Sequence, residues 1–257
     1  MPDMLANAAT AGHVTFVGAG PGDPDQLTLA AVRALSQARV VLHDRLVGAG
    51  VLALIAPGAQ VIEVGKTGFG PTTPQAAIHA LLVALAAGGR DVVRLKGGDC
   101  TIFARLDEET AALEAAGIGY SVLPGITAAS AAAAAAGRSL TLRGRNRAVR
   151  LVTGHEAEGL AEQDWRALAR PGEVAAIYMG KAAARFIQGR LLMHGAPADT
   201  PVTVVENATR PDERVMATDL AGLTDTASGL AGPAVLLLGI APRRRAGAVA
   251  ALREERA

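Results

Sequence analysis

Short runs of mostly hydrophobic residues recur along the chain, and longer segments rich in alanine and leucine separate them. The runs lie at 13–18, 39–44, 60–65, 91–97 and 120–125, and then at 148–154, 173–180, 201–207, 214–219 and 234–240. Several are almost continuously hydrophobic, which is typical of β-strands that are covered on both faces. The clearest helices between them are predicted at 27–38, 73–88 and 107–117.

The alternation of strands and helices predicts an α/β fold with a largely parallel sheet. Ten strands are many for one sheet, so we expect two α/β domains, each with a roughly five-stranded sheet, with a cleft between them. The predicted domains are 13–123 and 124–242, with the boundary at the turn that Pro124 and Gly125 make. Residues 1–12 and the basic tail 243–257 have no partner strand in this scheme, and we expect both to be flexible.

The composition indicates the cellular compartment and excludes several classes of binding partner. Half of the 257 residues are hydrophobic, and 25 basic residues against 24 acidic ones leave a net charge of +1, which argues against a nucleic-acid-binding protein. One cysteine, Cys100, excludes an internal disulfide and a cysteine-rich metal site. No apolar run reaches the roughly 20 residues that span a bilayer, and the first residues lack the pattern of a signal peptide. We therefore expect a cytoplasmic protein with no metal, no nucleic-acid partner and no membrane span.

Glycines and charged residues follow four predicted strands of the first half. Residues 18–21 follow the first strand, Asp44 the second, Lys66 the third, and 97–99, Gly-Gly-Asp, the fourth. Because open α/β sheets bind ligands outside the carboxyl ends of their strands, we expect a binding site here. Taken alone, Lys66 fits a solvated lysine better than a ligand, and Asp44 fits either a ribose-binding acid or a general base.

The loop after the first strand matches the glycine fingerprint of dinucleotide-binding proteins only in part. Gly18 and Gly20 occupy its first and third positions, but Asp23 occupies the sixth, where an acid would repel a pyrophosphate. The loop suits close approach of a ligand to the backbone. A tight turn in which Asp23 or Asp25 caps a helix is an equally supported interpretation.

A glycine-punctuated loop of the second half holds several arginines. It follows the alanine run 131–136, which is typical of close helix packing, and contains Arg138, Arg143, Arg145 and Arg147. Guanidinium groups bind carboxylates and phosphates bidentately, so the cluster suits a ligand that carries many of them. A solvated loop is the alternative.

A series of motifs runs in order through residues 13–241: VTFVGAGPGDPDQLTLAAVRAL, VVLHDRLV, a lone GK, TPQAAI, VVRLKGGD, VLPGITAA, LVTGH, IYMGK and VVENATRP. The series resembles the uroporphyrinogen-III C-methyltransferases, which are S-adenosylmethionine-dependent tetrapyrrole methylases. The resemblance implies two α/β domains with the cofactor in the cleft between them, in a homodimer. It also implies the activity, in which S-adenosylmethionine gives two methyl groups to uroporphyrinogen III. The product is precorrin-2, formed by way of precorrin-1 on the branch to sirohaem, cobalamin or haem d1, and S-adenosylhomocysteine is released.

The resemblance also assigns roles to individual positions. Asp44 aligns with the proposed proton acceptor, Lys66 with the proposed proton donor, and Arg105 with an arginine that faces the tetrapyrrole. The positions that align with cofactor contacts are Pro21, Gly97, Gly98, Asp99, Ile102, Thr127, Ala128, Met179, Ala208, Pro233 and Ala234. Since the substrate carries eight carboxylates, Arg45 and Arg143 join Arg105 as expected substrate-binding residues.

The chain departs from the usual family pattern near these positions. Cys100-Thr101 replaces Pro-Phe, Leu106-Asp107 replaces two glycines, His43 replaces a tyrosine, and Leu142 replaces a histidine. Because the Gly-Gly-Asp turn and Arg105 are kept, we expect an unchanged cofactor site and a reshaped tetrapyrrole side.

Three alternatives differ in what they predict. A later precorrin C-methyltransferase of the same fold would use the same cofactor and methylate another carbon. A nicotinamide- or nucleotide-binding protein would need a phosphate loop, which Asp23 disfavours. A non-catalytic tetrapyrrole carrier would bind the tetrapyrrole without turning over a cofactor.

Overall fold

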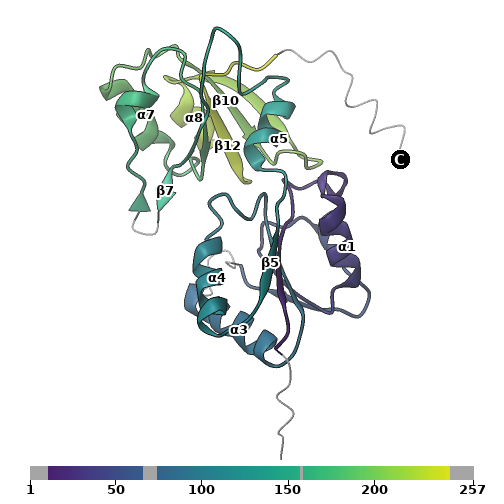
Figure 1. The fold of residues 1–257 in the computed structure, drawn as a ribbon. Helices are drawn as coiled ribbons and strands as arrows, with labels where there is room; N and C mark the ends of the chain where they lie inside the picture. The colour runs from purple at the N-terminus through teal and green to yellow at the C-terminus, as the bar shows by residue number, and fades with distance from the viewer. Residues whose placement is uncertain (1–10, 66–73, 157–158, 244–257) are drawn as a thin grey trace, which may run out of the picture. The chain divides into compact units, whose positions relative to one another are not determined.

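The computed structural model describes residues 11–65, 74–156 and 159–243. Its contacts divide the chain into two compact units, one up to Thr127 and one from Ala128 onward (Figure 1). Each unit contains one five-stranded sheet with helices on both faces. The predicted α/β class with two five-stranded sheets is confirmed, and all ten predicted strands form.

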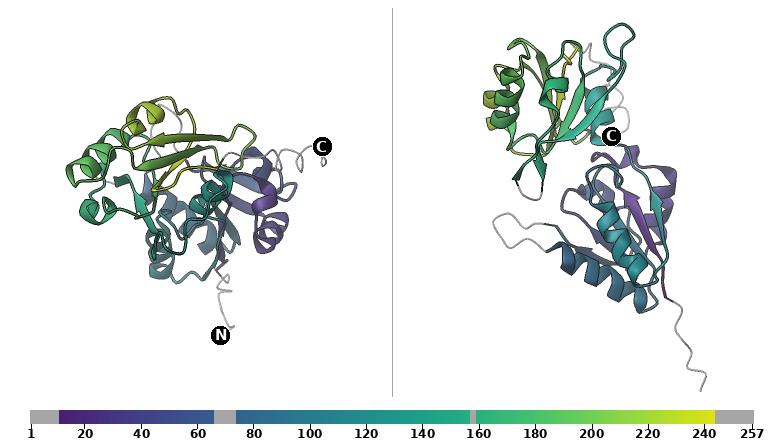
Figure 2. Two further views of the ribbon diagram at one scale, coloured as in Figure 1. Left: turned by 90° about the horizontal axis from the view of Figure 1, so that it is seen from above. Right: turned by 60° about the vertical axis from the view of Figure 1, so that its left-hand side comes forward.

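The sheet of the first unit is entirely parallel, in the order β3-β2-β4-β1-β5. Its strands are β1 (Val14–Gly18), β2 (Val40–His43), β3 (Gln60–Glu63), β4 (Val92–Lys96) and β5 (Tyr120–Leu123). Helices α3 (Gln75–Ala87) and α4 (Leu106–Ala115) cover one face, and α1 (Leu29–Gln37) and α2 (Ala49–Leu52) cover the other (Figure 2). Burial on both faces explains why β1, β2 and β4 are nearly continuous hydrophobic runs, whereas the edge strands β3 and β5 are mostly exposed or half-buried.

The sheet of the second unit is mixed, in the order β11-β10-β12-β9-β6. Its strands are β6 (Arg150–Thr153), β9 (Ala175–Tyr178), β10 (Pro201–Glu206), β11 (Arg214–Asp219) and β12 (Ala234–Leu238). Helix α5 (Ala128–Ala135) packs on one face, and α6 (Trp165–Leu168), α7 (Ala184–Met193) and α8 (Leu223–Ser228) pack on the other. A small hairpin of β7 (His155–Glu156) and β8 (Gly159–Leu160) stands apart from this sheet.

The prediction of a largely parallel sheet is wrong for the second unit. There, β10 pairs antiparallel with both β11 and β12, β12 pairs antiparallel with β9, and only β6 and β9 run parallel. Only the loop 207–213 joins β10 to β11. A connection this short allows a hairpin and is too short for the crossover that parallel neighbours need. The strand predicted at 214–219 has the bounds of β11.

Candidate functional site

Glycines let the loops after β1, β4 and β5 pack against one another. A Cβ on Gly18 would lie 2.4 Å from the backbone nitrogen of Gly125, and a Cβ on Gly125 would lie 2.4 Å from the carbonyl oxygen of Gly98. Gly20 and Gly98 also exchange two backbone hydrogen bonds, with N···O distances of 3.1 and 2.8 Å. The three loops therefore form one continuous backbone layer at the carboxyl edge of the first sheet, which leaves no room for side chains at Gly18 and Gly125.

Hydrogen bonds within residues 99–102 stabilise the Gly-Gly-Asp turn, and the space over Gly98 is open. The Asp99 carboxylate accepts hydrogen bonds from the backbone and hydroxyl of Thr101, both at 2.9 Å, and the amide of Ile102 donates to the Asp99 carbonyl at 3.1 Å. Gly98 has φ +68°, and among the described residues no atom beyond its own chain neighbours lies within 4 Å of where its Cβ would stand. Pro21, half-buried, follows the paired Gly20. A ligand can therefore reach the backbone of this turn.

The substituted Cys100 belongs to the core of the first unit. Its side chain is buried, its thiol donates to the Leu123 carbonyl at an Sγ···O distance of 3.4 Å, and burial raises its pKa to about 11. The residue therefore replaces the usual proline as a small apolar filler.

Asp23 acts as a cap, as one interpretation of the sequence predicted. Its carboxylate accepts a hydrogen bond from the Asp25 amide at 2.9 Å and caps the short 3₁₀ helix η1 (Pro24–Gln26). Helix α1 has its own cap, because the hydroxyl of Thr28 accepts from the amide of Ala31. The first loop thus ends in two local turns.

Asp44 lies at the carboxyl end of β2, beside a buried group of charges that sequence reasoning missed. Arg94 donates from Nη2 to Asp44 Oδ1 at 2.6 Å and from Nε to Glu109 Oε2 at 2.8 Å. Lys96 donates to Glu109 Oε1 at 2.5 Å, and Gln75 donates to the same oxygen at 3.2 Å. Arg94, Lys96 and Glu109 are at most 3% exposed, whereas the Asp44 side chain is 31% exposed.

Arg94 and Glu109 favour each other's ionised forms. Burial alone would raise the pKa of Glu109, but the cations of Arg94 and Lys96 bring it below its usual value. Burial opposes the charge of Arg94, yet the carboxylates of Asp44 and Glu109 raise its pKa. Burial and the neighbouring Arg94 lower the pKa of Lys96. With both carboxylates and both cations ionised, the group is neutral overall.

Arg105 precedes α4 in a left-handed conformation, with φ +56°. Its guanidinium donates to Glu108 at 2.8 and 2.6 Å, and about half of each side chain is exposed. These hydrogen bonds raise the pKa of Arg105 and lower the pKa of Glu108. The exposed guanidinium follows the Gly-Gly-Asp turn and is accessible to an anionic ligand.

Lys66 and Arg45 are two other predicted site residues of the first unit. Lys66 lies outside the described residues. Arg45 is exposed and directly follows Asp44, and a Cβ on Gly65 would lie 2.6 Å from its Cβ and its backbone nitrogen. The end of β3 therefore passes close beside the turn that carries Asp44.

The second unit brings its predicted cofactor residues to one edge of its sheet. Met179 follows β9 with φ +51° and is 49% exposed, and Ala208 follows β10. The backbone N–H of Asn207 donates to the Pro233 carbonyl at 2.9 Å, and Pro233 precedes Ala234, the first residue of β12. Since β12 runs antiparallel to β9 and β10, its start meets their ends. Helix α5, whose first residue is Ala128, packs against β12, and the Tyr178 hydroxyl accepts a hydrogen bond from the amide of its second residue at 3.0 Å.

Glu206 shapes this edge. Its buried carboxylate accepts from the amides of Ala231 and Gly232 at 2.6 and 2.5 Å and from Nε of Arg214 at 2.6 Å. Nearby, the buried amide oxygen of Asn207 has no hydrogen-bond partner within the described structure. A buried acceptor without a donor is costly, so this oxygen is suited to receive a ligand donor.

The arginine-rich loop divides into structural and exposed members. Arg138 donates to the Ala241 carbonyl, and Arg145 donates to the carbonyls of Ser139 and Leu140. Arg143 is exposed. At least two of the four arginines therefore hold the backbone together, and Arg143 stays a substrate-binding prediction.

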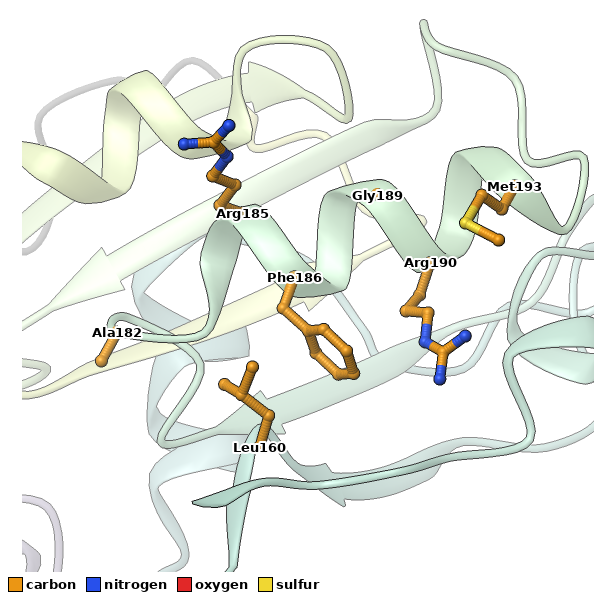
Figure 3. Close-up of a pocket in the computed structure, with 7 residues that line it drawn as sticks. All are labelled: Leu160, Ala182, Arg185, Phe186, Gly189, Arg190 and Met193. Carbon is orange, nitrogen blue, oxygen red and sulfur yellow. The ribbon is translucent and has the colours of Figure 1, made fainter.

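A pocket of about 580 Å³ in the second unit holds none of the predicted site residues. It lies along α7, with Leu160 and Phe186 facing each other and Arg190 over the Phe186 ring at 5.3 Å (Figure 3). Across the described ranges, no group of His, Cys, Asp and Glu is placed to hold a metal ion, and no helix is long and apolar enough to cross a membrane.

Comparison with known proteins gives consistent family matches. The family model of tetrapyrrole (corrin/porphyrin) methylases matches residues 13–224. Siroheme synthase 3 of Aeromonas hydrophila is 46% identical over 89% of this chain and 49% of its own length, and the siroheme synthase of Psychromonas ingrahamii is 43% identical over 93% and 51%. The chain thus spans about half the length of these curated relatives.

Solved structures show the same fold. The uroporphyrin-III C-methyltransferase of Thermus thermophilus, in complex with S-adenosylhomocysteine, superposes with a TM-score of 0.76 at 38% identity, over 89% of this chain and 92% of that one. A cobalt-precorrin-4 methyltransferase of cobalamin biosynthesis superposes with a TM-score of 0.78 at 28% identity, over 88% and 94%. Since the family model covers most of the chain and the relatives exceed 40% identity, the chain belongs to the tetrapyrrole methylase family.

Proposed function

We propose that this chain is an S-adenosylmethionine-dependent C-methyltransferase that converts uroporphyrinogen III to precorrin-2 in two methylations, by way of precorrin-1. The observation that carries this assignment is a difference in sequence identity. The fold matches the uroporphyrin-III and cobalt-precorrin-4 enzymes about equally, but the identity is 38% with the first and 28% with the second. The similarity to siroheme synthases supports the same early reaction.

The residues at the two sheet edges fit S-adenosylmethionine. Open space over Gly98 allows a ligand to lie on the backbone, and the unpartnered oxygen of Asn207 is able to accept from an amino group. The residues that we propose to bind the cofactor are Pro21, Gly97, Gly98, Asp99, Ile102 and Thr127 of the first unit and Ala128, Met179, Ala208, Pro233 and Ala234 of the second. When bound, the cofactor supplies an electrophilic methyl group.

The protein residues align the substrate and receive its proton. A pyrrole carbon of uroporphyrinogen III is electron-rich enough to attack a sulfonium methyl group, so the main task is to hold the two reactants in line. We assign Arg105, Arg45 and Arg143 to the substrate carboxylates. Asp44, partly exposed at the end of β2, takes the proton that the methylated ring loses. Lys66 keeps its proposed role as proton donor.

Anaerobic incubation with uroporphyrinogen III and S-adenosylmethionine, followed by mass spectrometry of the oxidised products, tests this function. We expect a gain of two methyl groups per tetrapyrrole. We also expect Asp44→Asn to bind S-adenosylmethionine normally in calorimetry while its methylation slows about 100-fold or more. Unmodified uroporphyrinogen III, with cofactor binding intact, would refute the assignment. The cofactor cleft, the domain limits, the homodimer and the cytoplasmic location stay predictions.

A further inference from the structure

Two charged residues occupy the face of the first sheet that is otherwise its hydrophobic core. Arg94 and Lys96 lie two residues apart on β4, so their side chains point to the same face as that of Val92, which belongs to the core under α3 and α4. On the neighbouring strand, Leu42 stands level with Arg94, and the Asp44 amide donates to the Leu95 carbonyl at 3.2 Å. The apolar face thus becomes ionic at the edge where the Gly-Gly-Asp turn begins.

Glu109 determines where the Arg94 guanidinium lies. It stands in the first turn of α4 and accepts from Nε of Arg94 at 2.8 Å, from Nη2 at 3.2 Å and from Lys96 at 2.5 Å. Nη2 of Arg94 also reaches Asp44 Oδ1 at 2.6 Å. Because a guanidinium is planar and rigid, fixing Nε and Nη2 on Glu109 fixes the direction of the hydrogen bond to Asp44.

Asp44 is the member of this group that reaches the solvent. Its side chain is 31% exposed, and Arg94, Lys96 and Glu109 are buried. Oδ1 is held by Arg94, and no hydrogen bond to Oδ2 is present within the described structure. A carboxylate held by one oxygen presents the other in a fixed direction, which is the geometry that a proton acceptor needs.

We propose that Arg94, oriented by Glu109, is the positioning residue for Asp44 and aims its free carboxylate oxygen at the tetrapyrrole. The proposal rests on the proposed function. As a C–H bond of the methylene bridge beside the methylated ring breaks, an O–H bond forms at Asp44 Oδ2, and the electron pair returns to the ring and cancels the positive charge gained with the methyl group. Arg94 keeps its proton throughout, because guanidinium does not lose it in proteins.

A contribution to stability alone does not account for this arrangement. Buried ion pairs generally stabilise no more than well-packed apolar residues of the same volume. Lys96 offers the comparison, because it has the same strand, the same face, the same 2% exposure and the same partner Glu109 as Arg94. Among the described residues, its ion pair is with Glu109 alone. A structural role predicts similar effects of replacing either cation, whereas a positioning role predicts that only Arg94 matters for turnover.

A double-mutant cycle on the full chain tests the proposal, with Arg94→Met, Asp44→Asn and the double variant assayed for methylation at saturating substrates. We expect each single variant to lower kcat about 100-fold, with the KM for S-adenosylmethionine unchanged. The double variant should fall no further than the lower single one, because Arg94 acts through Asp44. Lys96→Met is the matched control, and its kcat should stay within about threefold of wild type, because Lys96 makes no hydrogen bond to Asp44 within the described structure.

The possible failures are distinguishable. Multiplied losses in the double variant, about 10,000-fold, or an unchanged kcat in Arg94→Met would overturn the positioning role. If Asp44→Asn keeps full activity, the proposed proton acceptor fails, and if wild type does not methylate uroporphyrinogen III, the proposed function itself fails. Should Arg94→Met not fold, the cycle is run with Arg94→Lys. This variant keeps the charge but loses the rigid fork, so kcat should still fall in the wild-type background and not in the Asp44→Asn background.

Discussion

Replacing Glu109 by glutamine should cost the protein a large part of its stability. Within the described residues, the change leaves Arg94 with Asp44 as its remaining acidic partner and Lys96 with none, so the neutral group gains a net positive charge. The glutamine also places an NH₂ group where one Glu109 oxygen accepted a hydrogen bond from Arg94 or Lys96. Removing one partner of a buried ion pair costs about 3–5 kcal/mol. For a chain of this size, that loss lowers Tm by roughly 6–20 °C.

The neighbouring Glu108→Gln is the matched control for this measurement. Glu108 is on the same helical turn and also bonds an arginine, but the pair with Arg105 is about half exposed. Exposed pairs contribute about 0–1 kcal/mol. Thermal unfolding followed by circular dichroism, with urea unfolding for the free energies, compares the variants at neutral pH. Equal stability of the two variants would refute the view that Glu109 balances the buried cations.

Three further predictions concern the same unit. The pKa of Glu109 lies below its ordinary value, so the stability it contributes is complete above about pH 4.5 and is lost as the pH falls through the folded-state pKa. Wild type should therefore lose more stability than Glu109→Gln on acidification. Parallel curves of stability against pH for the two proteins would contradict this. Gly125→Ala should fold poorly or unfold at lower temperature, since its Cβ would lie 2.4 Å from the Gly98 carbonyl oxygen, and an unchanged Tm would show that the loops separate at no cost. The buried thiol of Cys100, with its pKa raised to about 11, should react with iodoacetamide only after unfolding, and rapid native labelling counted by mass spectrometry would disprove its burial.

The inner strands β1, β2 and β4 of the first unit were predictable because they are buried on both faces and form hydrophobic runs. The sequence also predicted which groups follow each strand. The direction of the strands in the second unit was misjudged, although the seven residues between β10 and β11 are too few for a crossover and were a usable signal. The bounds predicted for the strand at 214–219 match those of β11, although β11 has only exposed and half-buried residues at the sheet edge and lacks a hydrophobic run.

The buried charges of the first unit were missed for a different reason. Arg94 and Lys96 interrupt the hydrophobic run at 91–97, and strand alternation puts both on one face. Charged residues inside a strand covered on both faces need partners, so the pattern predicts an acid nearby. It does not identify Glu109 among the three consecutive acids 107–109, because that choice depends on how α4 packs on the sheet.

The most direct test of the central claim offers the protein two tetrapyrroles in parallel. Uroporphyrinogen III and precorrin-2 are each incubated anaerobically with S-adenosylmethionine, and the oxidised products are weighed by mass spectrometry while S-adenosylhomocysteine is quantified. We expect uroporphyrinogen III to gain two methyl groups, with two molecules of S-adenosylhomocysteine released per tetrapyrrole, and precorrin-2 to stay unchanged. Methylation of precorrin-2 without methylation of uroporphyrinogen III would contradict the account and identify a methylase of a later step.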